Sequence, residues 1–315
     1  MLLKQVLEVF DLLDSPHADG ENVKKLLLEA GVHQVESQRI QGPKGYTDFI
    51  KAVIPGRSGK ISGGNAPTLG IVGRLGGLGA RPERIGFVSD GDGAAVAVSA
   101  ALKLGRMYSL GDVLTGDIIV TTHICPHAPT RPHDPVPFMD SPVDIATMNK
   151  HEIDPAMDAI LSVDTTKGNR IINHRGFAIS PTVKEGYILR VSEDLLDIMT
   201  ITTGQLPVVF AITTQDITPY GNDVYHVNSI LQPSTATTAP CVGVAITAET
   251  PVPGCATGGS HPYDIELAAR FIIEVAKAFG ENKCKFYDEK EYQHLVCLYG
   301  SLGHLQTLGQ TCKKE

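Results

Sequence analysis

Apolar positions recur along the chain at two spacings, and these predict an alternation of helices and strands. Near the N-terminus, residues 2–13 and 21–30 carry apolar side chains at helical spacing, and Gly31 is expected to end the second helix. Short strands at 35–40 and 46–54 follow. Beyond them, helices are expected at 93–104, 193–201 and 262–279, and strands at 67–73, 85–89, 117–123, 159–163, 206–213 and 241–247.

The stretch of residues 89–130 organises the rest of the chain. Asp90 and Asp92 lead into a helix of small residues that Gly105 is expected to end. Its composition of Ala, Val and Leu predicts that this helix lies tightly against a sheet. Residues 117–123 are apolar and β-branched, which predicts a strand that is covered on both faces.

Polar side chains follow the predicted strands at the place where open α/β sheets build their sites. His123, Cys125 and His127 stand at the end of one strand, and Asp164 ends the next. Because the carboxyl ends of parallel strands meet at one edge of a sheet, we expect a site there. His261 stands immediately before a proline that is typical of the first helical position, so a helix N-terminus presents it beside another strand end.

Two long polar segments lie between the predicted strands. Residues 126–158 are rich in proline and show little periodicity, and a loop of this length is usually functional, so we expect it to cover the strand ends. Residues 216–239 hold Asp223 and His226, which are candidates for binding a substrate. The tail after Gly280 is weakly amphipathic and is expected to pack on the domain or on another subunit of a homo-oligomer.

The pattern as a whole predicts an α/β fold. We expect a three-layer architecture in which a mixed, mostly parallel sheet carries helices on both faces. At 315 residues the chain can bury a large core. A single α/β domain is expected over residues 1–315, with a C-terminal helical extension at 281–315.

Charge and composition narrow the classes of function. A net charge of −8 argues against nucleic acid or an anionic membrane as the main partner, because both need basic patches. The chain has no apolar run of about 18 residues, and Glu8 and Asp11 interrupt the apolar start, so neither a membrane span nor a signal peptide is expected. The six cysteines include no CxxC pair, which predicts reduced thiols in a cytoplasmic protein.

The order of these elements and polar residues resembles the co-catalytic zinc exopeptidases, a clan that includes the glutamyl and deblocking aminopeptidases. In that clan an aspartate opens a helix and bridges two zinc ions, another aspartate ends a later strand, and a histidine precedes the last helix. Asp92, Asp164 and His261 match these positions in turn, and Asp223 resembles a supporting aspartate. The chain also resembles an uncharacterised family of bacterial and archaeal proteins known only as a domain of unknown function.

Two positions of the clan pattern are not matched. The chain has Arg74-Leu75-Gly76 where the clan has His-x-Asp, and residues 123–125 where it has a Glu-Glu pair. A positive charge at Arg74 disfavours a second dication by Coulomb repulsion. The resemblance therefore implies an altered site with one divalent ion, zinc or alternatively manganese or iron. Arg74 is instead a candidate for binding a substrate carboxylate bidentately.

Three functions remain open. The first is a metal-dependent hydrolase of a small peptide or amide, in which one metal ion polarises the carbonyl and His123 or Cys125 stands near the place of the missing base. Its predicted metal ligands are Asp92, Asp164, His261 and His127. The second is a relative without catalysis that binds a peptide or an amino-acid ligand in the same cleft, or that acts as a subunit of a complex. The third is a thiol enzyme in which an imidazolium activates Cys125.

Each candidate residue also has a purely structural interpretation. Asp92 and His261 are typical helix-cap residues, and local hydrogen bonds can satisfy Asp164 at the end of its strand. Cys125 is equally typical of a buried thiol at the start of a loop. Arg74 on a glycine turn is typical of an exposed surface residue. The sequence alone does not choose between these interpretations.

Overall fold

The computed structural model describes residues 2–74, 76–79, 86–167, 171–212, 229–250, 252, 254, 256–257 and 259–306. Its α-helices are α1 (Leu2–Asp14), α2 (Gly20–Glu29), α3 (Asp92–Ser109), α4 (Ile145–Glu152), α5 (Glu193–Thr203), α6 (Pro262–Gly280) and α7 (Glu289–Tyr299). Its 3-10 helices are η1 (Ser89–Gly91), η2 (Ser229–Thr235) and η3 (Gly303–Leu305). Its strands are β1 (Gln34–Gly42), β2 (Gly45–Ile54), β3 (Leu69–Gly73), β4 (Ile118–Ile124), β5 (Thr130–Arg131), β6 (Phe138–Met139), β7 (Ala159–Thr165), β8 (Gly176–Ile179), β9 (Val183–Lys184), β10 (Tyr187–Ile188) and β11 (Cys241–Thr247).

One mixed sheet dominates the described part of the chain. Its strands run in the order β1-β2-β4-β3-β7-β11-β9-β10, and β8 pairs with β11. The pairs β3 with β4, β3 with β7 and β7 with β11 are parallel. The pairs toward both edges are antiparallel. The predicted α/β fold with a mixed sheet is therefore confirmed, but the sheet is partly parallel and not mostly parallel, because only the central strands β4, β3, β7 and β11 run parallel.

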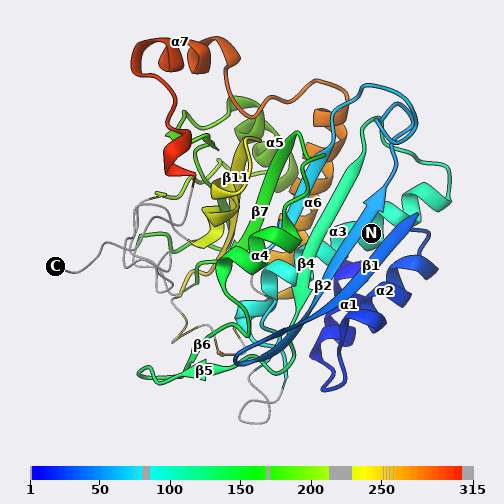
Figure 1. Ribbon diagram of the computed structural model, residues 1–315. Coiled ribbons are helices and arrows are strands. Elements are labelled where there is room, and N and C mark those ends of the chain that lie inside the picture. Colours follow the sequence, from blue (N-terminus) through cyan, green and yellow to red (C-terminus); the bar gives the residue numbers. More distant parts are fainter. Residues whose placement is uncertain are drawn as a thin grey trace.

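Helices cover both faces of this sheet, as predicted (Figure 1). On one face α3 packs against β3, β4 and β7, and α6 packs against β8 and β11, while α1 and α5 contact these helices. On the other face α4 packs against β2 and β4, and η2 packs against β7 and β11. Among the described residues, fewer helices pack on this second face than on the first.

The central strands are buried along their length. Every residue of β3, β4 and β11 is buried, which fits strands that are covered on both faces. Alternation along each strand divides the side chains between the two layers: Ile71 and Leu161 join the core under α3 and α6, whereas Val72 and Ile160 join the cluster under η2. Side chains that lie on the same face of β3 as Val72 are therefore directed toward α4 and η2. The same holds for the second residue after Val72, if the alternation continues past the end of the strand.

Helix α3 begins in close contact with two strand ends. A Cβ atom on Gly93 would lie 2.4 Å from the carbonyl oxygen of Arg74 and 2.6 Å from that of Val163, so only glycine fits there. The predicted end of the helix at Gly105 is wrong, because α3 continues to Ser109. A Cβ on Gly105 would lie 2.6 Å from the side chain of Val32, and this glycine therefore permits close packing instead of ending the helix.

Two predicted strands are not formed as expected. Of the range 85–89, residues 86–88 are irregular and Ser89 begins η1; Gly86 has a φ of 94°, which does not fit a strand. Of the range 206–213, the described residues contribute an isolated bridge between Val209 and Ile179. Proline at position 207 has no N–H to donate to a neighbouring strand, which limits pairing there.

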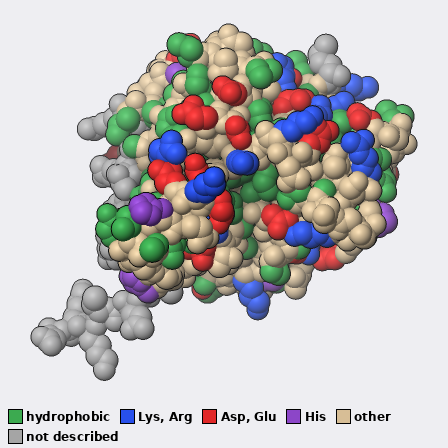
Figure 2. Space-filling model, turned by 90° about the horizontal axis from the view of Figure 1, so that it is seen from above, with side chains coloured by type: hydrophobic (Ala, Val, Ile, Leu, Met, Phe, Trp, Pro, Cys, Tyr) green, Lys and Arg blue, Asp and Glu red, His purple; other side chains and the backbone are tan. Residues whose placement is uncertain are grey.

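The surface and the helices bear on the expectation that neither a membrane nor nucleic acid is the main partner. None of the helices in the described ranges combines the length and hydrophobicity needed to cross a membrane. On the face shown in Figure 2, basic and acidic side chains are interspersed among the described residues. Neither sign of charge gathers there into one broad patch.

Candidate functional site

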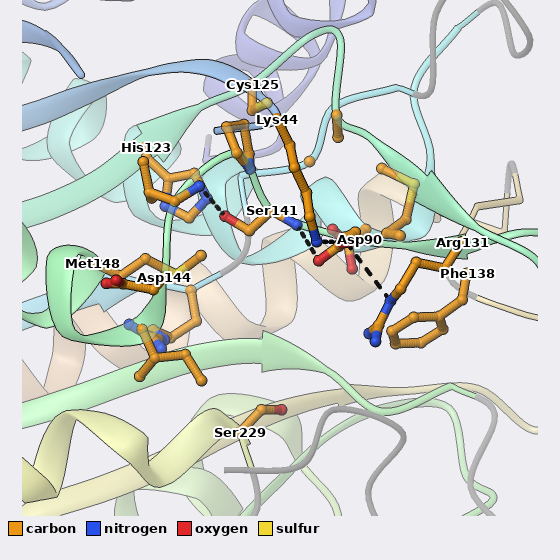
Figure 3. A pocket seen from close by; sticks show the side chains of 18 of the residues that line it. Lys44, Asp90, His123, Cys125, Arg131, Phe138, Ser141, Asp144, Met148 and Ser229 are labelled. Carbon is orange, nitrogen blue, oxygen red and sulfur yellow. Dashed lines mark hydrogen bonds and ion pairs between the residues drawn. The ribbon is translucent and has the colours of Figure 1, made fainter. Parts of the chain in front are cut away.

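A pocket of about 520 Å³ lies at the carboxyl ends of β3 and β4. Gly77 and Cys125, which follow these two strands and pair with one another, contribute to its lining. Most of its wall comes from residues 126–158, the proline-rich segment that was expected to cover the strand ends (Figure 3). The apolar side chains of that segment in the pocket include Phe138, Met139, Val143, Ile145, Ala146 and Met148.

Arg74 lines the pocket and is only 1% exposed. It follows β3 with the parity of Val72, so its side chain lies on the face of α4 and η2. Nη1 donates to Glu152 Oε2 at 2.6 Å and to Asn149 Oδ1 at 3.2 Å. Nη2 donates to Gln232 Oε1 at 3.2 Å. A single guanidinium thus ties the end of β3 to both elements of the second layer.

Glu152 connects Arg74 to His123. Nδ1 of His123 lies 2.7 Å from Glu152 Oε1, and the backbone N–H of Gly76 donates to Nε2 at 2.9 Å. A backbone N–H can only donate, so Nε2 is the acceptor and Nδ1 carries the ring proton. Because both ring nitrogens are engaged, the predicted role of His123 as a catalytic base does not fit this geometry.

The neighbours of Glu152 favour its ionised form. Burial by itself raises the pKa of this carboxyl, but the charge of Arg74 and the hydrogen bond from His123 outweigh burial, and the pKa lies below its ordinary value. The Thr121 hydroxyl also donates to the backbone carbonyl of Glu152 at 2.7 Å. Glu152, Arg74 and His123 therefore form a buried ion-pair network that joins β3, β4 and α4.

Two hydrogen-bond donors, one in this network and one on its neighbour Gln232, have no acceptor among the described residues. They are Nε of Arg74 and Nε2 of Gln232, and both residues line the pocket with 1% of their surface exposed. Leaving such a group buried and unsatisfied costs about 1–3 kcal/mol. The predicted bidentate contact of Arg74 with a carboxylate needs correction, because Nη1 and Nη2 already contact the protein and Nε is the nitrogen that remains.

Asp90 adds a second kind of polar group to the pocket. Its carboxyl packs against Gly77, since a Cβ on that glycine would lie 2.4 Å from Asp90 Oδ2. Burial, and then the charge of Asp92, raise the pKa of Asp90 to about 8. At neutral pH this carboxyl is therefore mostly protonated and can donate a hydrogen bond.

Lys44 and Arg131 converge at the rim of the pocket (Figure 3). Lys44 donates to the carboxylate of Asp140, and Nε of Arg131 lies 3.7 Å from the same carboxylate. The Arg131 guanidinium also lies over the Phe138 ring, 5.2 Å from its centroid. These contacts hold the residues around the β5–β6 hairpin at the mouth of the pocket.

Cys125 and His127 do not form a thiol site. Burial raises the pKa of Cys125 to about 12, so the thiol is protonated, and its Sγ donates to the carbonyl of Tyr46 at 3.6 Å. The side chain of His127 is exposed. The His123 ring, engaged by Glu152 and Gly76, is not available to activate the thiol, and the predicted catalytic role of Cys125 does not fit this geometry.

Asp92 opens α3, as predicted, but a lysine contacts its carboxylate. Lys167, which follows β7, donates from Nζ to Asp92 Oδ2 and to the carbonyl of Gly259, the latter at 2.7 Å. The Ser260 hydroxyl donates to Asp92 Oδ1 at 2.5 Å. Both oxygens are therefore engaged, and the ammonium group of Lys167 pairs with the carboxylate that would have to bind a divalent ion.

Local structure accounts for the positions of Asp164 and His261. Asp164 lies one residue before the end of β7, and its Oδ1 accepts the backbone N–H of Thr165 at 2.7 Å. His261 is the N-cap residue of α6, as predicted, and its side chain is exposed. Its carbonyl accepts the backbone N–H of Asp264 at 2.9 Å. Asp164 therefore matches the structural interpretation of the sequence, whereas His261 stands at the N-cap position without a side-chain cap hydrogen bond.

The described residues do not assemble the predicted metal site. No group of three or more His, Cys, Asp or Glu side chains in the described ranges is arranged to hold a metal ion. The set of Asp92, Asp164, His261 and His127 does not fit a divalent ion, because Lys167 and Ser260 engage Asp92 and the two histidines are exposed. Asp223 and His226 lie outside the described residues, and their roles in substrate binding stay predictions.

Sequence patterns do not single out four residues that the structure makes central: Glu152, Asn149, Gln232 and Lys167. A local signal exists for the first two, because Asp144 is an N-cap and the helix after it carries Asn149 and Glu152 three positions apart. Lys167 and Gln232 have no such signal. Their partners Asp92 and Arg74 lie 75 and 158 residues away along the chain.

Comparison of the sequence with known protein families identifies the family of this chain. A family model described as "Protein of unknown function (DUF1177)" matches residues 38–309. The chain belongs to the DUF1177 family. No curated protein matches it.

Two solved structures that are similar to this DUF1177 chain are aminopeptidases. A mutant of tomato leucine aminopeptidase is similar over 86% of this chain and 61% of that chain, with 11% identity and a TM-score of 0.53. The LapA aminopeptidase of Legionella pneumophila is similar over 91% of this chain and 72% of that chain, with 10% identity and a TM-score of 0.49. The chain therefore has an aminopeptidase-like fold, which confirms the fold that the resemblance to zinc exopeptidases implied. It spans about 61% of the length of the tomato enzyme.

Proposed function

We propose that this protein binds a small amino-acid-like or peptide-like ligand in the pocket at the carboxyl ends of β3 and β4. The observation that carries the proposal is that two residues of the pocket lining, Arg74 and Gln232, each hold a buried donor, Nε and Nε2, without an acceptor among the described residues. Small-molecule sites typically have volumes of about 300–1,000 Å³, apolar walls and a few convergent polar groups. The pocket, at about 520 Å³, has all three properties.

Binding fits the described residues better than catalysis does. A hydrolase needs a base within reach of the attacking water, or an activated nucleophile. The ring nitrogens of His123 are engaged, and the thiol of Cys125 is protonated. Asp92 is neutralised by Lys167. These three features support a protein with an aminopeptidase-like fold that binds its ligand without catalysing a reaction.

The second candidate function is metal-dependent hydrolysis of a small peptide or amide at an altered metal site. The aminopeptidase-like fold favours it. It requires a metal site that the described residues do not assemble, and Asp223 and His226 keep their predicted role in binding the substrate. Metal analysis of untagged protein, combined with assays on aminoacyl and peptidyl amides, separates the two functions. We expect well below one zinc, manganese or iron ion per chain and no turnover; a stoichiometric metal accompanied by turnover would favour hydrolysis.

Ligand binding is tested directly by calorimetry. Titration with apolar amino acids, dipeptides and their N-acylated forms is expected to give saturable binding by at least one class. Ala146 and Lys150 are both exposed on α4, and Ala146 lines the pocket whereas Lys150 is not part of its lining. Ala146→Trp fills the pocket and should abolish binding, whereas the control Lys150→Trp should preserve it. Equal binding by both variants, or no binding by the panel, contradicts the proposal.

A further inference from the structure

The polar groups deep in the pocket offer hydrogen-bond donors. Nε of Arg74 and Nε2 of Gln232 can only donate, and both lack an acceptor among the residues that the structure describes. The carboxyl of Asp90 lies against Gly77 in the same pocket and is itself buried. A ligand that satisfies this end of the pocket must bring acceptors.

The remaining carboxylates that line the pocket already have partners. Asp140 accepts from Lys44 and lies 3.7 Å from Arg131. Asp144 is exposed, and it caps α4 by accepting a backbone N–H of the first turn at 2.7 Å. Neither offers an unengaged and desolvated carboxylate of the kind that would hold an ammonium group firmly. A ligand with a free amine would therefore lose the hydration of that amine without a matching partner.

Part of the pocket wall is apolar. Phe138, Met139, Val143 and Met148 contribute to it, and Met139 and Met148 are themselves buried. Such a wall favours an aliphatic or aromatic body over a polar one. The pocket thus presents an apolar surface that leads to donors.

Building on the proposed function, we propose that the ligand is a small carboxylate with an apolar body and no free amine, such as an N-acylated apolar amino acid, with its carboxylate against Arg74 Nε and Gln232 Nε2. This specificity is opposite to that expected of a site that holds a free amino terminus. The Lys44 and Arg131 side chains at the rim favour the approach of an anion.

Four compounds with the same side chain test the proposal on the unmodified protein: N-acetyl-leucine, leucine, leucine amide and N-acetyl-leucine amide. Calorimetry at neutral pH is expected to show N-acetyl-leucine binding at least about tenfold tighter than each of the others. Equal or tighter binding of leucine or leucine amide overturns the inference while the pocket keeps its proposed function. Failure of all four overturns the inference, and failure of the wider panel as well overturns the proposed function.

A substitution at Gln232 tests whether the carboxylate of the ligand binds next to this residue. Gln232→Glu keeps an acceptor for Arg74 Nη2 but replaces the Nε2 donor with a negatively charged oxygen. It should weaken N-acetyl-leucine by at least about tenfold and leave N-acetyl-leucine amide unchanged. Equal losses for both compounds would place the carboxylate elsewhere and overturn the assignment. Lys44→Met at the exposed rim provides a second variant that leaves the core intact, and it should slow association of the anionic compound selectively.

Discussion

Nζ of Lys167 donates to the carboxylate of Asp92, and neither side chain is more than 1% exposed. Moving two charges out of water is costly, and a buried pair offsets that cost only when further hydrogen bonds complete it. Gly259 and Ser260 provide those bonds. At the position where the resemblance to zinc exopeptidases implies a carboxylate that bridges metal ions, this chain therefore neutralises the carboxylate with a lysine of its own.

Lys167→Met should destabilise the protein strongly, because it leaves the Asp92 carboxylate buried without a cation. Loss of one partner of a buried pair costs about 3–5 kcal/mol, which urea denaturation measures. Adding Asp92→Asn should recover part of the loss. The control is Lys283→Met, which removes an exposed pair with Glu281 and should cost no more than about 1 kcal/mol. Equal losses in the two single variants would contradict a buried role for Lys167.

Glu152→Gln should remove a stabilisation that depends on pH. The pKa of Glu152 in the folded protein lies below its ordinary value of 4.5. Its contribution is therefore present above about pH 4.5 and is lost as the pH falls through the folded pKa. Denaturation curves between about pH 7 and pH 3 should show the variant less stable at neutral pH by about 3–5 kcal/mol, with the gap narrowing in acid. A gap that does not change with pH would refute the ionised network.

Asp90→Asn should stabilise the protein increasingly as the pH rises. The folded pKa of about 8 lies above the ordinary value of 3.8, so the native state keeps a proton that the unfolded chain releases. The stabilisation that the neutral Asp90 carboxyl contributes is fully present below about pH 3.8 and is lost as the pH rises through about 8. Melting temperatures of the two proteins should thus diverge between these values and run parallel above them. A constant difference across this range would show that Asp90 is ionised throughout.

Alkylation should be fast at the exposed cysteine and slow at the buried cysteines of the described residues. Cys125, Cys241 and Cys284 are buried, and burial raises the pKa of each thiol to about 12, whereas Cys297 is exposed. Iodoacetamide should modify Cys297 in the native protein and leave Cys125 intact, which peptide mass spectrometry reads directly. Denatured protein, in which all thiols react, is the control. Modification of Cys125 at the rate of Cys297 would restore the thiol-enzyme hypothesis.

Much of the architecture is predictable because its signals are local. The apolar periodicity places α1, α2 and the strands of the β1–β2 hairpin within two residues of their observed bounds, and Pro262 marks the start of α6. Asp92 and Asp164 likewise stand at a helix start and near a strand end, as expected. The physical reason is that hydrophobic spacing, caps and glycine conformation depend on neighbours a few residues away.

The sequence by itself therefore determined the mixed α/β fold and the edge of the sheet where a pocket forms. Only the tertiary structure decided what lies at that edge. The partners of Asp92 and Arg74 come from 75 and 158 residues away, and Gly105 continues a helix because Val32 packs against it. Such contacts produce no periodic pattern in the sequence. The partner of a buried charge is the group that tertiary packing places next to it, and this group can come from any part of the chain.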